Sequence, residues 1–235
     1  MSEENNVKKC LPAGLYALTP DSADDDWLVE AVAAAVRGGA SAVQYRSKML
    51  EGTARLRQAR RLAETCRAGG ALFIVNDSVA LAQDTAADGV HLGRDDEDPA
   101  AARRALGPDA IVGVSCYDSL ERALAARQAA DYCAFGSVFL SAVKPGAVRA
   151  PLALFAQARA SGLYPVAIGG IDAGNAGQVA AAGAAAVAVI TAVFGEGREG
   201  GCAGLAEIES RARKIVEAFE AAQQSASIPP SSAVR

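Results

Sequence analysis

The sequence predicts a single-domain (β/α)8 barrel, and three observations lead to that prediction. Short apolar segments rich in alanine, valine and isoleucine alternate with helical patterns eight times along the chain. The alternation fills a length typical of this fold, and no linker-like stretch interrupts it. The 235 residues are 51% hydrophobic but only 5% aromatic, which suits helices packed on buried parallel strands. A doubly wound sheet is the alternative architecture with the same alternation.

Each predicted strand is a short apolar run bounded by glycine, proline or polar residues. The strands are expected at residues 14–19, 42–46, 71–76, 89–93, 111–116, 132–139, 165–169 and 186–193. Each predicted helix repeats its apolar residues at helical spacing. The helices are expected at residues 27–37, 53–67, 79–86, 99–106, 119–129, 151–160, 174–182 and 205–222.

Local signals mark several helix ends. Glycine pairs follow the first two helices as C-caps, and Pro99 suits the first turn of its helix. We expect residues 1–13 to form a flexible N-terminal segment, because they are polar. Residues 14–222 then form the barrel, and residues 223–235, which contain Pro229-Pro230, form a disordered tail.

The charge and apolar patterns exclude several functional classes. A net charge of −4 and a pI near 5.2 argue against a nucleic-acid or membrane-surface partner. An arginine cluster lies within one predicted helix, at Arg55, Arg57, Arg60 and Arg61, and is most simply a solvated face. The N-terminus lacks the apolar core of a secretory signal, and the apolar stretch at 181–194 is too short for a membrane span. A homo-oligomer is compatible with the sequence.

Cysteine and histidine usage narrows the chemistry further. The five cysteines form no CxxC pair and are odd in number, which indicates reduced thiols in a cytoplasmic protein. His91 is the single histidine, so a histidine-rich zinc site is excluded. Since His91 lies inside a predicted strand, we expect it to pack there.

Aspartates stand where two neighbouring predicted strands end. Asn76 and Asp77 follow one strand, and Asp95 and Asp96 follow the next. A strand, a helix and a second strand make a parallel pair, so both acidic ends meet at one edge of the sheet. Paired carboxylates repel each other, and Mg²⁺ bound together with substrate phosphates would relieve that repulsion. For either aspartate alone, a helix cap or a solvated acidic loop is the simpler interpretation.

Polar residues follow most other predicted strands as well. They are Gln44, Arg46 and Lys48 after strand 2; Ser115, Cys116 and Tyr117 at strand 5; Ser141 and Lys144 after strand 6; Gly169 and Gly170 after strand 7; and Ile190 and Thr191 in strand 8. Catalytic groups of a (β/α)8 barrel lie at these strand ends. Arginine and lysine bind phosphate oxygens, and glycines let backbone N–H groups approach a second phosphate. The pattern predicts a site for a diphosphate with Mg²⁺, and it contains no evident general base.

At these residues the chain resembles the thiamine-phosphate synthase family, also called thiamin phosphate pyrophosphorylase, from about residue 14 to 194. The matching segments are QYRSK at 44–48 (QLRxK in the family), ND at 76–77, GVHLGRDD at 89–96, GVS at 113–115, FGSVF at 135–139, KP at 144–145, AIGGI at 167–171 and VIT at 189–191. IGGI alone occurs in many phosphate-binding barrels, whereas the ordered series is specific.

The resemblance implies a transferase of thiamine biosynthesis that joins a hydroxymethylpyrimidine diphosphate to a thiazole phosphate and releases pyrophosphate. Asp77 and Asp96 would hold Mg²⁺. The pyrimidine diphosphate would be held by Gln44, Arg46, Lys48, Asn76, Ser115 and Lys144, among which Arg46, Lys48, Ser115 and Lys144 would also act in catalysis. The thiazole phosphate would be held by Ser141, Gly170, Ile190 and Thr191.

Four residues depart from the family pattern and bear on affinity. The loop after strand 6, FPTxTK in the family, has Leu140 in place of proline and Val143 in place of a hydroxyl residue. Arg94 replaces a frequent glutamine, and Tyr117 replaces a frequent histidine.

Two other functions stay open. A thiazole tautomerase of the same fold family would use a histidine shortly after the strand 5 serine, where this chain has Tyr117, and would lack the second metal aspartate. A non-catalytic binding protein for thiamine precursors is supported only by the altered loop.

Overall fold

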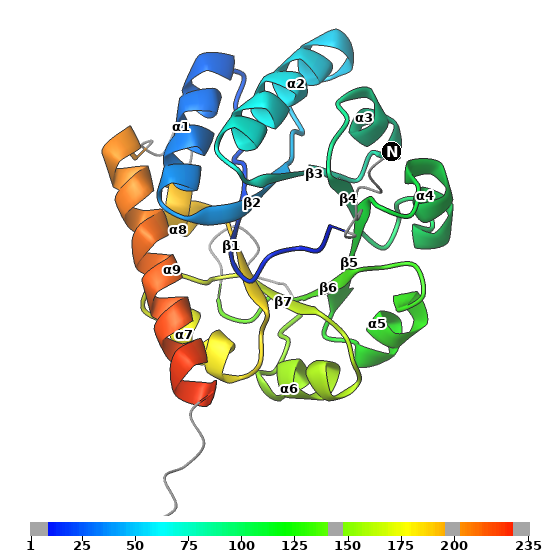
Figure 1. Cartoon of the computed structure of the whole chain (residues 1–235), viewed down its shortest axis with the longest axis vertical. Helices are drawn as coiled ribbons and strands as arrows, with labels where there is room; N and C mark the ends of the chain where they lie inside the picture. The colour runs from blue at the N-terminus through cyan, green and yellow to red at the C-terminus, as the bar shows by residue number, and fades with distance from the viewer. Residues whose placement is uncertain (1–8, 141–147, 196–202, 228–235) are drawn as a thin grey trace, which may run out of the picture.

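The computed structural model describes residues 9–140, 148–195 and 203–227. Eight parallel strands pair in sequence order, and β1 closes on β8 to complete the barrel. Viewed close to the barrel axis, the strands form an inner ring and the helices an outer ring (Figure 1). The predicted (β/α)8 fold is confirmed.

The observed elements follow the predicted alternation. The strands are β1 (Gly14–Leu18), β2 (Ala40–Tyr45), β3 (Leu72–Asn76), β4 (Gly89–Leu92), β5 (Ile111–Tyr117), β6 (Tyr132–Phe135), β7 (Pro165–Ile168) and β8 (Ala186–Val189). The helices are α1 (Asp25–Arg37), α2 (Gly52–Ala68), α3 (Val79–Asp84), α4 (Pro99–Leu106), α5 (Leu120–Ala126), α6 (Ala153–Ala160), α7 (Ala176–Ala181), α8 (Thr191–Phe194) and α9 (Leu205–Ser227).

Alternation along the strands separates two apolar layers. Side chains on one strand face fill the barrel interior, where Ile74, Ile111 and Val166 pack together. Side chains on the other face pack against the helices; Val43 and Val75 are examples under α1 and α2. Because every strand is buried on both faces, the strands read as continuous apolar runs in the sequence.

The N-terminal segment, for which flexibility was predicted through residue 13, contacts the barrel from residue 9 onward. Leu11 is buried with the barrel-interior residues. The Lys9 ammonium contacts the Asp88 carboxylate at 2.6 Å. The polar composition of the first residues gave no indication that Leu11 packs into the barrel. Residues 1–8 lie outside the described part of the chain.

Strands β6 and β8 are shorter than predicted. After Phe135 the chain turns toward β7, and the N–H of Val138 donates to Ile168 O at 3.0 Å without continuing the ladder with β5. After Val189 the chain forms the short helix α8 instead of extending the strand to residue 193. The run of valine, isoleucine and threonine there has strand character, so its periodicity could not reveal the break.

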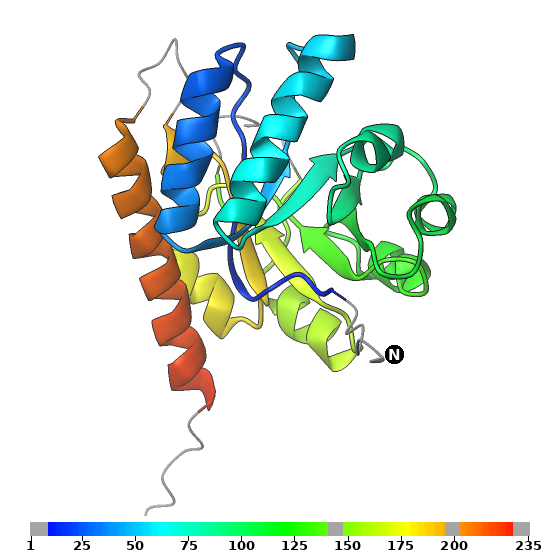
Figure 2. The ribbon, with the colours of Figure 1, turned by 45° about the horizontal axis from the view of Figure 1, so that its top comes forward.

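Helix α9 packs along α1 and α7 on the outside of the barrel, as two views show (Figures 1 and 2). It runs to Ser227, beyond the predicted end at residue 222, because alanine and glutamine after that position are good helix formers. Within the described ranges, no helix has the length and apolar character that crossing a bilayer requires.

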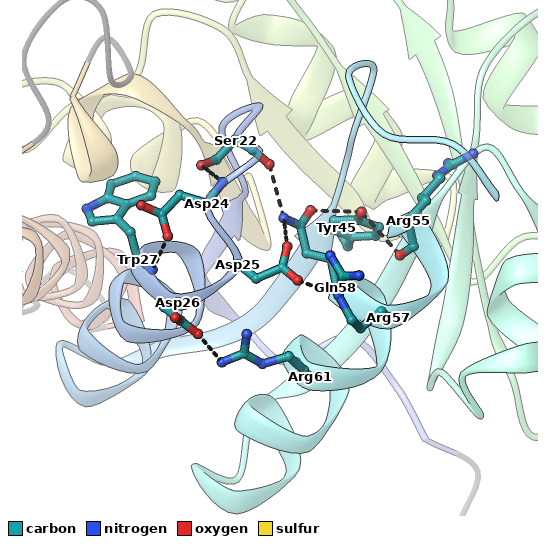
Figure 3. A network of polar contacts seen from close by, with 10 residues as sticks. All are labelled: Ser22, Asp24, Asp25, Asp26, Trp27, Tyr45, Arg55, Arg57, Gln58 and Arg61. Carbon is teal, nitrogen blue, oxygen red and sulfur yellow. Dashed lines mark hydrogen bonds and ion pairs between the residues drawn. The ribbon is translucent and has the colours of Figure 1, made fainter. Parts of the chain in front are cut away.

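The arginine cluster of α2 is only partly the solvated face that was predicted. Arg57 and Arg61 form ion pairs with Asp25 and Asp26 at the start of α1, at 2.9 and 2.7 Å (Figure 3). The Arg55 side chain points away from these pairs (Figure 3), and its Nε is buried without a hydrogen-bond partner among the described residues. Arg55 is therefore half-buried, with its Nε shielded from solvent, rather than fully solvated.

Candidate functional site

A cavity of about 540 Å³ opens at the carboxyl ends of the strands. Eight of the predicted site residues line it: Gln44, Arg46, Asn76, Asp77, Ser115, Gly170, Ile190 and Thr191. Lys48 and Asp96 are exposed on loops that follow β2 and β4. Ser141, Val143 and Lys144 lie outside the described residues. The structure thus brings most of the predicted binding groups together in one place.

The loop after β2 is fastened to the end of β1. The Arg46 N–H donates to Thr19 Oγ1 at 3.0 Å, and the Arg46 guanidinium contacts the Asp21 carboxylate at 3.4 Å. The same carboxylate accepts from the Lys48 N–H at 2.5 Å. Asp21 therefore orients the loop that carries both cations, a role that the sequence analysis missed.

Asp77 and Asp96 meet at the ends of β3 and β4. Burial, and then the contact with the Asp96 carboxylate and its charge, raise the pKa of Asp77 to about 6. The positive charges of Arg46 and Arg55 oppose this rise. Asp77 has a left-handed backbone with φ 66°, which aspartate tolerates better than most residues. Proximity of the two carboxylates, as predicted from the strand ends, is confirmed.

Glycine at position 93 permits the Asp96 carboxylate to fold back onto its own loop. The Gly93 N–H donates to Asp96 Oδ2 at 2.6 Å. A Cβ at position 93 would lie 2.8 Å from that oxygen. The Asp96 side chain is therefore held close to Asp77 by its local turn.

The donor set at this point fits Mg²⁺ bound jointly with a substrate. Two carboxylates contact each other, and among the described residues no group of three or more His, Cys, Asp or Glu side chains could hold a metal. Mg²⁺ prefers oxygen ligands and commonly takes one or two carboxylates, with phosphate oxygens and water completing its coordination. Asp77 and Asp96 match that pattern.

A bulge at the end of β5 directs two side chains into the cavity. The pairing of β5 with β6 shifts between Ser115 and Tyr117, and Tyr117 has φ 55°. Bulges commonly re-aim side chains next to active sites. The Arg94 guanidinium lies 4.7 Å from the centre of the Tyr117 ring. The two departures from the family pattern at positions 94 and 117 therefore contact each other at the rim.

The opposite side of the cavity is built from backbone. Gly169 and Gly170 have φ values of 98° and 67°, and a Cβ on Gly170 would lie 2.4 Å from Leu140 O. The Asn175 side chain donates to Gly170 O at 2.9 Å and holds this turn. The first N–H groups of α8, beginning at Thr191, have no acceptor within their own helix. Such groups form the phosphate site of many barrels.

The barrel interior adds cavity residues that the sequence analysis did not assign. His91 and Tyr16 line the cavity floor. Burial lowers the pKa of His91 to about 4, and burial raises the pKa of Tyr16, so both side chains are neutral at pH 7. His91 packs inside its strand as predicted, but strand alternation also points it at the cavity, a signal that the sequence already contained.

Comparisons with known proteins agree with this geometry. The family described as thiamine monophosphate synthase matches residues 15–193. The chain is 60% identical over 182 residues to the thiamine-phosphate synthase of Chromobacterium violaceum, covering 77% of this chain and 88% of that protein. It is 56% identical over 183 residues to the same enzyme of Aromatoleum aromaticum, again with 77% and 88% covered.

A solved structure supports the same relationship. The thiamine phosphate pyrophosphorylase of Pyrococcus furiosus superposes with a TM-score of 0.76 at 32% sequence identity. The match covers 90% of this chain and 96% of the other.

Proposed function

The chain belongs to the thiamine-phosphate synthase family of transferases, and from that premise we propose how its cavity carries out the reaction. The substrates are a hydroxymethylpyrimidine diphosphate and a thiazole phosphate, and the products are thiamine phosphate and pyrophosphate. The contact between Asp77 and Asp96 at the cavity mouth, with Arg46 beside them, carries the proposal.

The pyrimidine diphosphate would lie on the side of the cavity formed by β2 to β5. Its terminal oxygens would meet the Arg46 guanidinium and the Lys48 ammonium, while the Ser115 hydroxyl and the Asn76 amide supply neutral donors. Asp77 and Asp96 would hold Mg²⁺. The bound ion would neutralise the negative charge that develops on the departing diphosphate. Lys144, outside the described residues, is assigned to the same substrate by the family motif.

The thiazole phosphate would lie on the side formed by β7 and β8. Gly170, Ile190 and Thr191 line the cavity there, and their backbone N–H groups would serve as donors to the phosphate. Ser141 is assigned to this phosphate from its motif alone. This placement would hold the thiazole nitrogen toward the pyrimidine methylene, so that binding energy would supply much of the orientation that the reaction needs.

No general base is required by this reaction. The aminopyrimidine ring stabilises positive charge at its methylene as pyrophosphate leaves, and the thiazole nitrogen attacks as a neutral nucleophile. Both nitrogens of His91 are hydrogen-bonded to protein groups, to Tyr132 OH and Ser115 Oγ. The residues therefore act by binding, orientation and charge stabilisation. The odd number of cysteines without a CxxC pair supports a cytoplasmic location for this reaction.

The assay combines the purified chain with both phosphorylated precursors and Mg²⁺, and quantifies thiamine phosphate and pyrophosphate. We expect equimolar formation of the two products, and no formation in excess chelator. Asp77→Asn and Asp96→Asn should remove activity while circular dichroism stays unchanged, since asparagine keeps the side-chain shape. Binding of both precursors without turnover by the unmodified chain would instead favour the non-catalytic binding protein.

A further inference from the structure

Five side chains from five strands form one hydrogen-bonded chain across the barrel interior. Gln44 Nε2 donates to Tyr16 OH at 2.8 Å, and Tyr16 OH lies 2.9 Å from Tyr132 OH. Tyr132 OH lies 2.9 Å from His91 Nδ1, and His91 Nε2 lies 2.9 Å from Ser115 Oγ. We call these five residues the interior relay. It begins and ends at residues that line the cavity.

Packing fixes the relay in place. Tyr16 and Tyr132 meet edge to face with ring centres 5.9 Å apart, and the His91 ring stacks on Tyr132 at 5.5 Å. Gly113 makes room for the Tyr132 phenol, because a Cβ at position 113 would lie 2.0 Å from Tyr132 Cζ. Tyr16, Tyr132 and His91 are all buried. The hydroxyl and ring positions are therefore set by the fold before any substrate binds.

Each hydrogen bond of the interior relay can be assigned a donor and an acceptor, starting from Gln44. An amide nitrogen only donates, so the oxygen of Tyr16 accepts from Gln44. Because Tyr16 is buried, its own hydrogen needs an acceptor, and we direct it to Tyr132, the other hydroxyl within reach. The hydrogen of Tyr132 then goes to His91 Nδ1, which must be unprotonated. His91 consequently carries its proton on Nε2 and donates it to Ser115 Oγ. The hydrogen of the Ser115 hydroxyl is left for a partner in the cavity.

We propose that the interior relay holds the Ser115 hydroxyl as a hydrogen-bond donor aimed at the substrate diphosphate, with His91 as a positioning residue in its Nε2–H tautomer. This inference rests on the proposed function for the identity of the ligand. A diphosphate offers only acceptor oxygens, so a serine whose lone pair is occupied by His91 Nε2–H is prepared to donate. Preorganised donors of this kind need no reorientation as charge develops on the leaving group.

The opposite direction of the hydrogen bonds in the interior relay would give Ser115 a different chemical role. If Gln44 presented its oxygen to Tyr16, every hydrogen would reverse and His91 would be protonated on Nδ1. The Ser115 hydroxyl would then donate to His91 Nε2, which is the arrangement of a serine activated by a base. The tautomer of His91 therefore distinguishes a donor serine from an activated one.

The first test reads that tautomer directly. His91 is the only histidine in the chain, so ¹⁵N-histidine labelling of the full-length protein reports on one ring. Long-range ¹H–¹⁵N correlation identifies Nε2 as the nitrogen coupled strongly to both ring carbon-bound protons. We expect the proton on Nε2 in the ligand-free protein at neutral pH. A proton on Nδ1 would overturn the proposal.

The second test uses two substitutions of His91 that differ in side-chain length. His91→Gln places an amide nitrogen at the position of Nε2, whereas His91→Asn reaches only the position of Nδ1. We expect His91→Asn to raise the KM for the pyrimidine diphosphate about two- to tenfold, the range of one neutral hydrogen bond, and His91→Gln to restore most of that loss. The KM for the thiazole phosphate should stay unchanged in both. Equal losses in the two variants, or equal effects on both substrates, would overturn the positioning role.

Tyr132→Phe interrupts the relay without touching either end of it. We expect it to raise the KM for the pyrimidine diphosphate and to mix the two tautomers of His91. Tyr45→Phe is the matched control, because Tyr45 is also buried and bonds Gln58 Oε1 at 2.9 Å, but on the α2 side of the barrel wall (Figure 3). If Tyr45→Phe has the same kinetic effect, the loss is structural and the relay has no such role.

The experiments distinguish failure of the proposed function from failure of the proposed role of the interior relay. If the unmodified chain forms no thiamine phosphate, the proposed function fails. The ligand-free tautomer still decides the relay's direction in that case.

Discussion

Burial of a neutral His91 should make the fold lose stability in acid. The pKa of His91 is about 4 in the folded chain, against about 6.5 when unfolded. The unfolded state therefore binds the additional proton between these values. The stabilisation is complete above about pH 6.5 and is lost as pH falls toward about 4.

The magnitude follows from the difference between the two pKa values. At about 1.4 kcal/mol per unit, the full effect is roughly 3 kcal/mol, of which roughly 2 should be lost by about pH 4.5. Asp77 acts in the opposite direction, because its pKa is raised to about 6 and its folded form binds a proton first. A comparison of two proteins that both contain Asp77 cancels that contribution.

The assay is reversible urea unfolding of the unmodified chain and of His91→Gln at about pH 7 and about pH 4.5. We expect His91→Gln to lose roughly 2 kcal/mol less unfolding free energy between the two conditions. Tyr45→Phe, the control, should lower stability without changing its pH dependence. If His91→Gln shows the same acid-induced loss as the unmodified chain, His91 is not the buried neutral base described above.

Three substitutions test the proposed assignments within the cavity by steady-state kinetics, with each substrate varied in turn. Arg46→Ala should weaken use of the pyrimidine diphosphate about ten- to a hundredfold, as expected for a charge-assisted hydrogen bond, and equal effects on both substrates would show the wrong phosphate was assigned. Gly170→Ala should raise the KM for the thiazole phosphate, because the new Cβ would lie 2.4 Å from a backbone oxygen. The control is Gly162→Ala, where φ is a similar 76° but no atom lies within 4 Å of the new Cβ, and it should leave both KM values unchanged. The positive charge of Arg55 opposes the rise in the pKa of Asp77, so Arg55→Met should weaken pyrimidine diphosphate use although Arg55 does not line the cavity. Arg57→Met, which removes a guanidinium paired with Asp25 at the surface, should not, and equal KM values in the two variants would show that Arg55 does not act on the site.

The barrel was predictable because its signals are local. Each strand is a short run buried on both faces, and glycine or proline marks most boundaries, so the alternation could be read residue by residue. The neighbouring ends of β3 and β4 followed from parallel pairing, which explains why Asp77 and Asp96 could be placed together. Chain topology alone carried that inference.

Other features depended on contacts between distant residues. Leu11 enters the barrel from a polar segment, and the break before α8 interrupts a run with uniform strand character. Arg55 shares a helix with Arg57, yet the Nε of Arg55 is buried while the Arg57 side chain is exposed, a difference that their common helix does not reveal. The interior relay joins residues from five strands, and no spacing along the chain reveals it.

The most direct test of the account is a calorimetric titration of pyrophosphate, the leaving product, into the full-length chain with and without Mg²⁺. If the metal and the diphosphate share one site, pyrophosphate should bind in the presence of Mg²⁺ and lose most of its affinity without it. Asp77→Asn and Asp96→Asn should each abolish the effect of Mg²⁺, whereas Asp26→Asn, which changes an exposed carboxylate on α1, should leave it intact. Pyrophosphate binding that is equally tight in both aspartate variants and indifferent to Mg²⁺ would contradict the account.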